Sequence, residues 1–196
     1  IFDIEWFFKD PSIYYNSARD FIYNLDSVRP SIVHEELARL EKLGLIKSVI
    51  TQNIDLLHQK AGSKRVIELH GSPDPHRCIE CGKTVSFSEA AAVVNSGDVP
   101  CCKKCGGVLK PDIIFFGEQL PAGALSDAIA EAEMADLLLV LGSTLLVQPA
   151  ASIPLYTLRK GGKVVIINNM DTPFDDRASL RYTELGEVFR YISGNI

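Results

Sequence analysis

Two pairs of cysteines form the most specific chemical pattern in this sequence. Each pair has the spacing Cys-x-x-Cys, and 20 residues separate the pairs, whose members are Cys78, Cys81, Cys102 and Cys105. This pattern is typical of a tetrahedral zinc site in which four thiolates fill the coordination sphere. Because no position stays open for a substrate, we predict one structural zinc ion that stabilises a short, loop-rich module.

Two neighbouring residues are alternative ligands for this zinc ion. Cys101 directly precedes Cys102, and the two-residue spacing to Cys105 favours Cys102 as the ligand, with Cys101 as the alternate. His76 is close enough in sequence to compete, but a complete set of four cysteines argues against it.

A second group of residues follows five short apolar runs, at points where buried strands would end. The five sets are Gln52-Asn53-Ile54-Asp55, His70-Gly71, Gly117-Glu118, Gly142-Ser143-Thr144 and Asn168-Asn169. In open parallel sheets, ligands bind beyond the carboxyl ends of the strands. Five such endings therefore predict a ligand site along one edge of a sheet.

The residue types in these sets suit a nucleotide that carries a carboxamide. The Gly142–Thr144 segment offers backbone N–H groups and hydroxyls ahead of a helical pattern, which suits a phosphate. Asn168 or Asn169 could bond a ribose hydroxyl, and Asp55 could accept from an amide NH₂ group. Imidazoles serve as general bases near neutral pH, so His70 is the candidate base, and Glu118 is a candidate second acid.

The elements that must position these residues alternate between two periodicities. Continuous β-branched-rich runs, typical of strands buried on both faces, cover residues 46–51, 65–69, 112–116, 136–142 and 163–169. Helical patterns separate several of them, at residues 54–62, 122–135 and 150–162. This alternation predicts an α/β fold, with a Rossmann-like open parallel sheet and crossover helices.

The chain divides into three kinds of segment by pattern. Residues 1–43 are helical, with a break near Pro11, an N-cap at Ser31 and a C-cap at Gly44. Residues 44–74 and 110–196 carry the strands of the Rossmann-like domain. Residues 75–109 hold the cysteines, and we expect an inserted zinc-binding module there.

Composition and charge narrow the functional classes. The chain has 196 residues, 46% of them hydrophobic, and a net charge of −5, which gives no indication of binding to nucleic acid or anionic membrane. No apolar run reaches the roughly 18–20 residues of a membrane span, and we find no signal peptide. All five cysteines fall within residues 78–105, which favours metal binding in a reduced, cytoplasmic setting over disulfides.

Taken together, the sequence resembles the sirtuin family of NAD-dependent protein lysine deacylases, of a bacterial or archaeal type. The matching segments, in family order over nearly the whole chain, are TQNIDLLHQKAG, VIELHG, the two cysteine pairs, KPDIIFFGE, LGSTLLVQPA and VVIINN. The resemblance implies a Rossmann-like large domain, a small zinc domain with a helical segment, and a cleft that takes NAD and an acetyl-lysine protein or peptide.

The resemblance also implies a role for each candidate site residue. His70 and Asn53 would be catalytic, with His70 as the base on a ribose hydroxyl while the acetyl oxygen attacks the ribose carbon and nicotinamide leaves. Asp55 would hold the carboxamide. The implied NAD contacts are Gln52, Asn53, Ile54, Asp55, His70, Gly142, Ser143, Thr144, Asn168, Asn169 and Gly186. Ile114 and Phe116 would line the acyl-lysine tunnel, and Gly117, Glu118 and Val147 would contact the peptide, partly through backbone pairing.

The sequence departs from the family pattern at its beginning. The Gly-Ala-Gly-x-Ser phosphate loop and the Asp-Phe-Arg segment typical of sirtuins do not occur, so we expect the first sheet strand and half of the cofactor site to be missing. The chain would then be part of a longer protein or a defective fragment. Alternatives to an NAD-dependent deacetylase are a non-catalytic module that binds NAD, ADP-ribose or peptide, and a mono-ADP-ribosyltransferase on the same scaffold.

Simpler structural roles compete with several of these assignments. His70 could be a capping or core histidine, and Asn53 and Asp55 could form an N-cap for the following helix. Sirtuins that prefer succinyl groups carry Tyr-x-x-Arg in the early helical segment, whereas here Tyr15 precedes Arg19 by four positions. On a helix, one extra residue turns the arginine by about 100°, which favours deacetylation over desuccinylation.

Overall fold

A computed structural model describes the backbone of residues 1–196 and every side chain except that of Asp26. The chain forms two compact units. Unit 1 comprises Ile1–Arg29, Gln52–Leu57 and His70–Pro121, and unit 2 comprises Pro30–Thr51, His58–Leu69 and Ala122–Ile196. Each unit has its own core.

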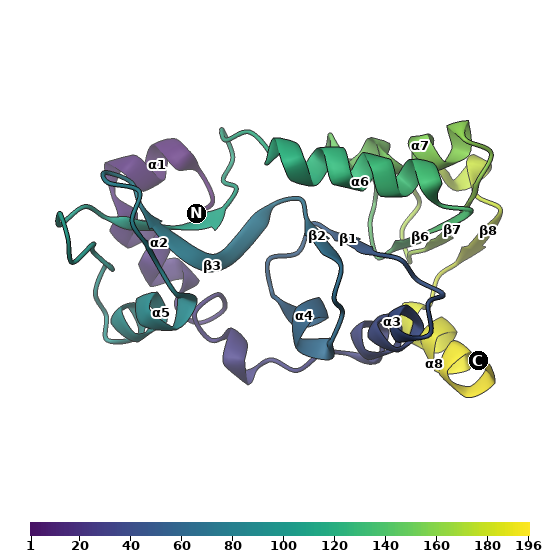
Figure 1. Cartoon of the computed structure of the whole chain (residues 1–196), viewed down its shortest axis with the longest axis horizontal. Helices are drawn as coiled ribbons and strands as arrows, with labels where there is room; N and C mark the ends of the chain where they lie inside the picture. Colours follow the sequence, from purple (N-terminus) through teal and green to yellow (C-terminus); the bar gives the residue numbers. More distant parts are fainter. The chain divides into compact units, whose positions relative to one another are not determined.

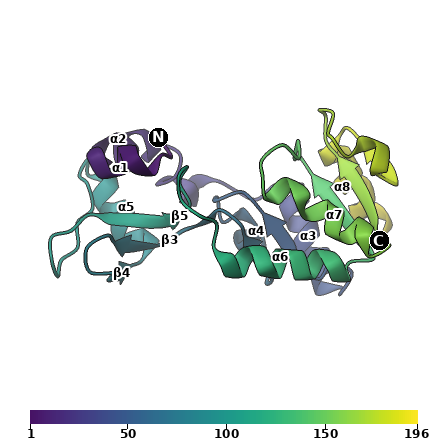
Figure 2. The same cartoon turned by 90° about the horizontal axis from the view of Figure 1, so that it is seen from above.

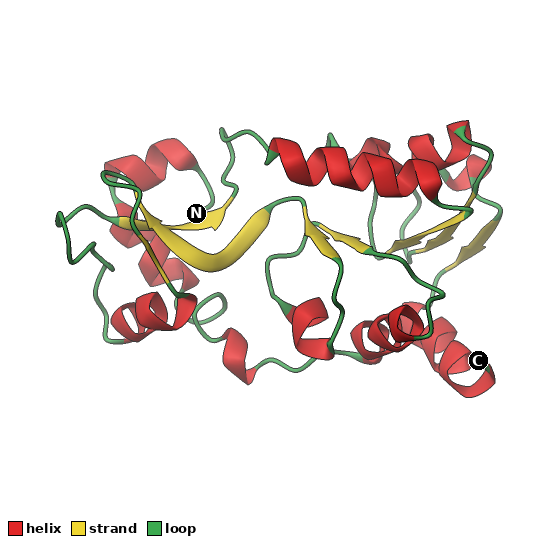
Figure 3. Cartoon of the chain, in the orientation of Figure 1, coloured by secondary structure: helices red, strands yellow, loops and turns green.

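Unit 2 is a three-layer α/β structure (Figures 1 and 3). Strand β1 (Val49–Thr51) pairs in parallel with β2 (Val66–Glu68). A second parallel sheet has the order β6 (Leu137–Leu141), β7 (Lys163–Ile167), β8 (Leu180–Tyr182). Helices α6 (Ala122–Met134) and α7 (Ile153–Arg159) lie on one side of the strands, and α3 (Ile32–Lys42) and α8 (Leu185–Asn195) lie on the other. The predicted Rossmann-like parallel architecture is confirmed.

Both faces of these strands are buried by apolar side chains. Ala128 and Ala132 of α6 are almost fully buried against Ile67 and Leu69, because small side chains let the helix approach closely. On the opposite face, Leu37 of α3 and Phe189 of α8 pack with alternate residues of β7. This double burial explains why the strands read as continuous apolar runs rather than as alternating patterns.

Each of the two described parallel sheets of unit 2 has an unpaired strand edge at both ends, at β1 and β2 in one sheet and at β6 and β8 in the other. Among the described strands, β1 pairs with β2 alone, and β6 pairs with β7 but with no strand on its other side. Strand β6 is accordingly less buried than β7, and Leu137 is 52% exposed.

Unit 1 is built around an antiparallel sheet of order β4-β3-β5, with β3 at Gly71–Cys78, β4 at Thr84–Val85 and β5 at Leu109–Ile113. Helices α1 (Ile4–Lys9), α2 (Pro11–Ala18) and α5 (Phe87–Asn95) accompany this sheet (Figure 2). Edge-to-face aromatic pairs dominate the core, for example Phe7 with Tyr14 and Phe115. The remaining short elements are α4 (Leu57–Ala61) and three 3₁₀ turns at Leu25–Ser27, Ala150–Ser152 and Asp175–Arg177.

Local sequence signals set several helix ends as predicted. Asp10 accepts from the N–H of Ser12, and Pro11 opens α2 at its first position, where a missing N–H does no harm. At α3, the N–H of the N-cap residue Ser31 donates to Nδ1 of His34, 3.2 Å away. Gly44 follows α3 with a φ of +75°, a left-handed conformation that glycine adopts without strain.

One strand assignment from the sequence is wrong. The apolar run at 112–116 was expected to be a strand of the parallel sheet, but β5 ends at Ile113 and runs antiparallel to β3 in unit 1. A short apolar run indicates burial on both faces and does not specify the direction of the partner strand. The single edge predicted for all five strand ends therefore does not hold for Gly117 and Glu118.

Candidate active site

His70 lies between β2 and β3 and is held by backbone groups of unit 1. Its Nδ1 atom is 2.9 Å from the carbonyl oxygen of Gln52. Because a carbonyl only accepts, Nδ1 carries the proton, and Nε2 is left as the basic nitrogen. The carbonyl of His70 accepts in turn from the N–H of Ile114 at 2.9 Å. The Gln52 carbonyl therefore orients the imidazole, and the Ile114 N–H fixes the backbone of His70.

The next residue, Gly71, makes this arrangement possible. Its φ is +71°, and a Cβ atom there would overlap the carbonyl oxygen of Asp112 on β5. Only glycine combines that conformation with so close an approach of two backbones. The tight start of β3 thus determines where the His70 backbone lies.

The segment 52–56 is a strained loop that ends in an Asx turn. Oδ1 of Asp55 accepts from the N–H of Leu57 at 2.9 Å, at the start of α4. The capping role weighed for Asp55 is therefore present, and it uses one carboxylate oxygen. Leu56 has a φ of +58°, which is rare for a residue with a side chain and is often found at functional sites. Ile54 packs against the unit 1 core, whereas Asn53 is exposed.

In unit 2, the loop that begins at Gly142 and the loop that begins at Asn168 start at the ends of neighbouring strands. Leu141 of β6 is in register with Ile167 of β7, and the N–H of Gly142 donates to the carbonyl of Ile167 at 2.9 Å. Gly142 and Asn168 therefore lie side by side, at carboxyl ends of parallel strands as expected. The hydroxyl of Ser143 accepts from the N–H of Leu145, which has a φ of +54°.

A polar network fixes the loop that follows Asn168. Nδ2 of Asn168 donates to the carbonyl of Met170 at 3.0 Å. The guanidinium of Arg181 also donates to that carbonyl, and it pairs with Asp171 and Asp175 at 3.2 and 2.9 Å. Hydrogen bonds from the Thr172 hydroxyl, followed by those from its N–H and from Arg181, lower the pKa of the Asp175 carboxyl. The network was not found from the sequence, because its charges are scattered along a loop.

The other predicted residues of unit 2 lie at the surface or in a helix. Asn169 and Val147 are exposed, Thr144 is partly buried, and Gly186 lies in the first turn of α8.

The predicted substrate-binding residues of unit 1 occupy the turn after β5. Phe115 points into the core with 1% exposure, while the Phe116 side chain is 76% exposed. The backbone of Phe116 pairs with an N-terminal segment, accepting from Ile4 at 3.1 Å and donating to Phe2 at 2.8 Å. Ile114 is partly buried, Gly117 is exposed, and the Glu118 carboxylate turns toward Lys110.

The four predicted cysteine ligands converge in unit 1. The sulfur atoms of Cys78, Cys81, Cys102 and Cys105 all lie within 4.8 Å of one another. The Cys78–Cys105 and Cys81–Cys102 sulfur distances are 3.4 and 3.7 Å. Tetrahedral zinc with Zn–S bonds of about 2.3 Å requires S–S separations near ~3.8 Å. The residues present therefore fit one structural zinc ion.

The two alternative ligands are placed elsewhere. The Cys101 thiol is exposed and directed to the carbonyl of Val99, whereas Cys102 is 3% exposed and belongs to the quartet. Backbone N–H groups of Lys104 and then Cys105 lower the pKa of the Cys102 thiol to about 6, which favours the thiolate that binds metal. His76 is fully buried, and its Nε2 atom is 2.7 Å from the hydroxyl of Tyr23.

The two residues considered for succinyl recognition are used inside unit 1. The hydroxyl of Tyr15 donates to the carbonyl of Leu109 in the core. Nε of Arg19 donates to the carbonyl of Val94 at 3.0 Å, and its Nη2 donates to Asn16. Neither side chain is arranged to bind a ligand carboxylate.

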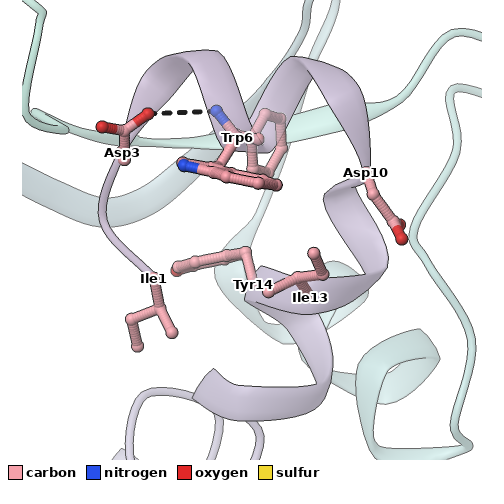
Figure 4. Close-up of a pocket in the computed structure, with 7 residues that line it drawn as sticks. Ile1, Asp3, Trp6, Asp10, Ile13 and Tyr14 are labelled. Carbon is pink, nitrogen blue, oxygen red and sulfur yellow. Dashed lines mark hydrogen bonds between the residues drawn. The ribbon is translucent and has the colours of Figure 1, made fainter.

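A pocket of about 240 Å³ between α1 and α2 contains none of the predicted site residues (Figure 4). Its two carboxylates, those of Asp3 and Asp10, cap these helices, and Asp3 accepts from the N–H of Trp6 at 3.0 Å. A second pocket of about 320 Å³ lies on the sheet of unit 1, beside Lys110 and Glu118. In the described part of the chain, no helix is both long and apolar enough to cross a membrane.

Comparison with known proteins identifies the family. The Sir2 family model matches residues 1–149. An NAD-dependent protein deacetylase of Thermotoga maritima is 48% identical over 182 residues, which cover 93% of this chain and 74% of that protein.

Solved structures agree with this assignment. A structure of Sir2 with p53 peptide and NAD⁺ has a TM-score of 0.94 at 46% identity, covering 99% of this chain and 81% of that one. A mutant Sir2 with deacetylated p53 peptide and 3′-O-acetyl-ADP-ribose has a TM-score of 0.92 at 45% identity, covering 98% and 79%. By these measures of sequence and structure, the chain belongs to the Sir2 family.

Proposed function

We propose that this chain is an NAD-dependent protein lysine deacetylase that releases nicotinamide and O-acetyl-ADP-ribose. The observation that carries the proposal is the orientation of His70, whose Nδ1 atom is bonded to the carbonyl of Gln52. Relatives that share most of the chain are named NAD-dependent protein deacetylases, and Sir2 structures contain NAD⁺, acetylated peptide or O-acetyl-ADP-ribose.

His70 acts as the general base in this proposal. With its proton held at Nδ1 by Gln52, the imidazole presents a basic Nε2 that can accept the proton of a ribose hydroxyl. The hydrogen bond that orients the imidazole is already present in the structure, and its acceptor is a backbone carbonyl. Asn53 lies in the exposed part of the neighbouring loop and is the second proposed catalytic residue.

NAD supplies the leaving nicotinamide and the ribose carbon to which the acetyl oxygen is transferred. We assign the nicotinamide end of NAD to Gln52, Ile54 and Asp55. Because Oδ1 of Asp55 accepts from the N–H of Leu57, its other carboxylate oxygen can accept from the carboxamide NH₂. The remaining contacts we assign to unit 2, with phosphate or ribose at Gly142–Thr144, adenosine ribose at Asn168 and Asn169, and adenine near Gly186.

The peptide substrate is assigned to the exposed turn after β5 and to Val147. Ile114 and Phe116 would border the acyl chain, and Gly117 and Glu118 would offer backbone groups to an extended peptide. The zinc ion, held by the four clustered cysteines, has a structural role because the quartet leaves no open coordination position. A cytoplasmic location suits this site, since it requires reduced thiols.

The test is turnover of an acetyl-lysine peptide with NAD, followed by mass spectrometry of the products. We expect nicotinamide and O-acetyl-ADP-ribose, and His70→Ala should lower turnover by roughly 10²–10⁴-fold with zinc content unchanged. His34→Ala is the matched control, because His34 caps α3 and contacts the ring of His58 but has none of the proposed catalytic or binding roles.

Three outcomes would contradict the proposal in different ways. Peptide binding without nicotinamide release would favour a binding module. Adenine label from NAD that stays on protein would favour mono-ADP-ribosyl transfer. Full activity of His70→Ala would refute the assigned base.

A further inference from the structure

We propose that Lys110 is a positioning residue that holds the Phe115–Glu118 turn in its substrate-binding form. This inference rests on the proposed function, which assigns the turn to the peptide. Lys110 lies on β5 in unit 1 and carries none of the roles described above.

The ammonium group of Lys110 is almost enclosed by protein. Its side chain is 11% exposed, and Nζ lies 2.9 Å from a carboxylate oxygen of Glu118. Nζ also donates to the carbonyl oxygens of Ile113 at 2.7 Å and Pro111 at 3.3 Å. An ammonium has three protons, so these three acceptors satisfy it. The ring of Phe115 lies 4.3 Å from Nζ and adds a favourable cation–π contact.

Glu118 connects the Lys110 ammonium group to the backbone of the turn. The same carboxylate oxygen that pairs with Lys110 accepts from the N–H of Phe115 at 2.7 Å. The N–H of Glu118 donates back to the carbonyl of Phe115 at 3.0 Å. The turn is therefore closed by a side-chain bond and a backbone bond, with Gly117 at a φ of +95° between them.

This geometry assigns the Glu118 carboxylate to the turn rather than to chemistry. Both of its partners, the Lys110 ammonium and the Phe115 N–H, belong to the same turn or to the strand before it. In this inference the Glu118 carboxylate has a structural role in the turn. Its backbone groups remain those that a bound peptide would meet.

Removal of the Lys110 charge should loosen the turn while leaving the fold intact. Without the cation, the negative Glu118 side chain gains by moving into water, and the Phe115 N–H then loses its acceptor. A second ion pair on the same sheet, Arg77 with Asp112 at 2.8 Å, provides a matched control. That pair is more exposed, at 53% and 32%, and it lies outside the turn.

The experiment compares Lys110→Met with Arg77→Met by hydrogen exchange and by peptide binding. In Lys110→Met, we expect the Phe115 and Glu118 amides to exchange roughly tenfold faster, as the loss of one charge-assisted hydrogen bond predicts. The Kd and KM for an acetyl-lysine peptide should rise by about tenfold, while KM for NAD and the zinc content stay constant. Arg77→Met should change none of these quantities, and Lys110→Arg should restore most of the peptide affinity.

Two results would overturn the inference: unchanged exchange at these amides in Lys110→Met, or faster exchange with unchanged peptide affinity. If Lys110→Met fails to fold, Glu118→Gln tests the same contacts by removing the negative charge alone. Either of the two results would then overturn the inference in the same way. Peptide binding and exchange do not require turnover. A wild-type protein that binds peptide without releasing nicotinamide would therefore refute the deacetylase proposal alone.

Discussion

The close approach of Gly71 to β5 leads to a quantitative prediction for Gly71→Ala. The substitution adds one methyl group at a φ of +71°, and this left-handed conformation alone costs about 1 kcal/mol. The new Cβ would overlap the carbonyl oxygen of Asp112 and lie 3.1 Å from its carbonyl carbon. Both neighbours are backbone, so β3 and β5 must separate, which adds roughly 1–3 kcal/mol of overpacking.

Separation of these strands also weakens the bond from the Ile114 N–H to the His70 carbonyl, worth about 1 kcal/mol. We therefore expect Gly71→Ala to lower the free energy of unfolding by about 3–5 kcal/mol. Gly82 is the matched control in unit 1, because its φ is +70° and a Cβ there meets no atom within 4 Å. Gly82→Ala should cost only about 1 kcal/mol.

Urea unfolding of the zinc-loaded protein measures both variants, with peptide turnover as a second readout. A displacement of His70 by about 1 Å should reduce turnover on the order of 10²-fold, whereas Gly82→Ala should retain activity. If the losses of unfolding free energy in the two variants differ by less than about 0.5 kcal/mol, which is within the error of additive estimates, the steric argument is wrong.

Three further predictions concern the metal site, a loop and a buried histidine. Cys102→Ser should weaken zinc binding by roughly 10²–10³-fold, as the loss of one thiolate of four implies. Cys101→Ser should retain one zinc ion, measured by native mass spectrometry. Equal loss of zinc in both variants would refute the ligand assignment. Arg181→Met should raise KM for NAD by about three- to tenfold without changing KM for peptide, because it releases the loop after Asn168, and Arg177→Met serves as the comparison. Burial lowers the pKa of His76 to about 4, below its value of about 6.5 in the unfolded chain. The contribution of neutral His76 to the free energy of unfolding is therefore complete above pH ~6.5 and decreases as the pH falls toward 4. Between pH 7 and pH 5, His76 should lower the free energy of unfolding of the wild-type protein by about 2 kcal/mol. Urea titrations at the two pH values should show a loss that is smaller by this amount in His76→Phe.

Much of the unit 2 framework could be predicted because its strands are buried on both faces. Continuous apolar runs located β1, β2, β6 and β7, and helical spacing located α3, α6 and α7. Strand β3 was missed because its sequence, GSPDPHRC, has two prolines and no apolar alternation. It forms a strand because it pairs with β5 and leads into the first cysteine ligand, both of which depend on residues far along the chain.

The site was predictable where spacing alone carries the chemistry. The cysteine quartet follows from two Cys-x-x-Cys pairs, and His70 from its place after an apolar run. The bond between His70 and the Gln52 carbonyl joins residues 18 positions apart, so no local pattern reports it. The positive φ values of Leu56 and Leu145 also leave no trace in residue type, since leucine disfavours that conformation.

The open edges of β1 and β6 have a consequence for how this chain behaves at high concentration. An unpaired strand edge presents a row of N–H and C=O groups that another chain can pair with. Strand β6 is uncharged throughout its sequence, LLLVL, and lacks the lysine or proline residues that usually protect an edge. Association through this edge would grow with concentration and resist added salt, because backbone pairing does not depend on net charge. A peptide that supplies a single parallel strand should suppress such aggregation.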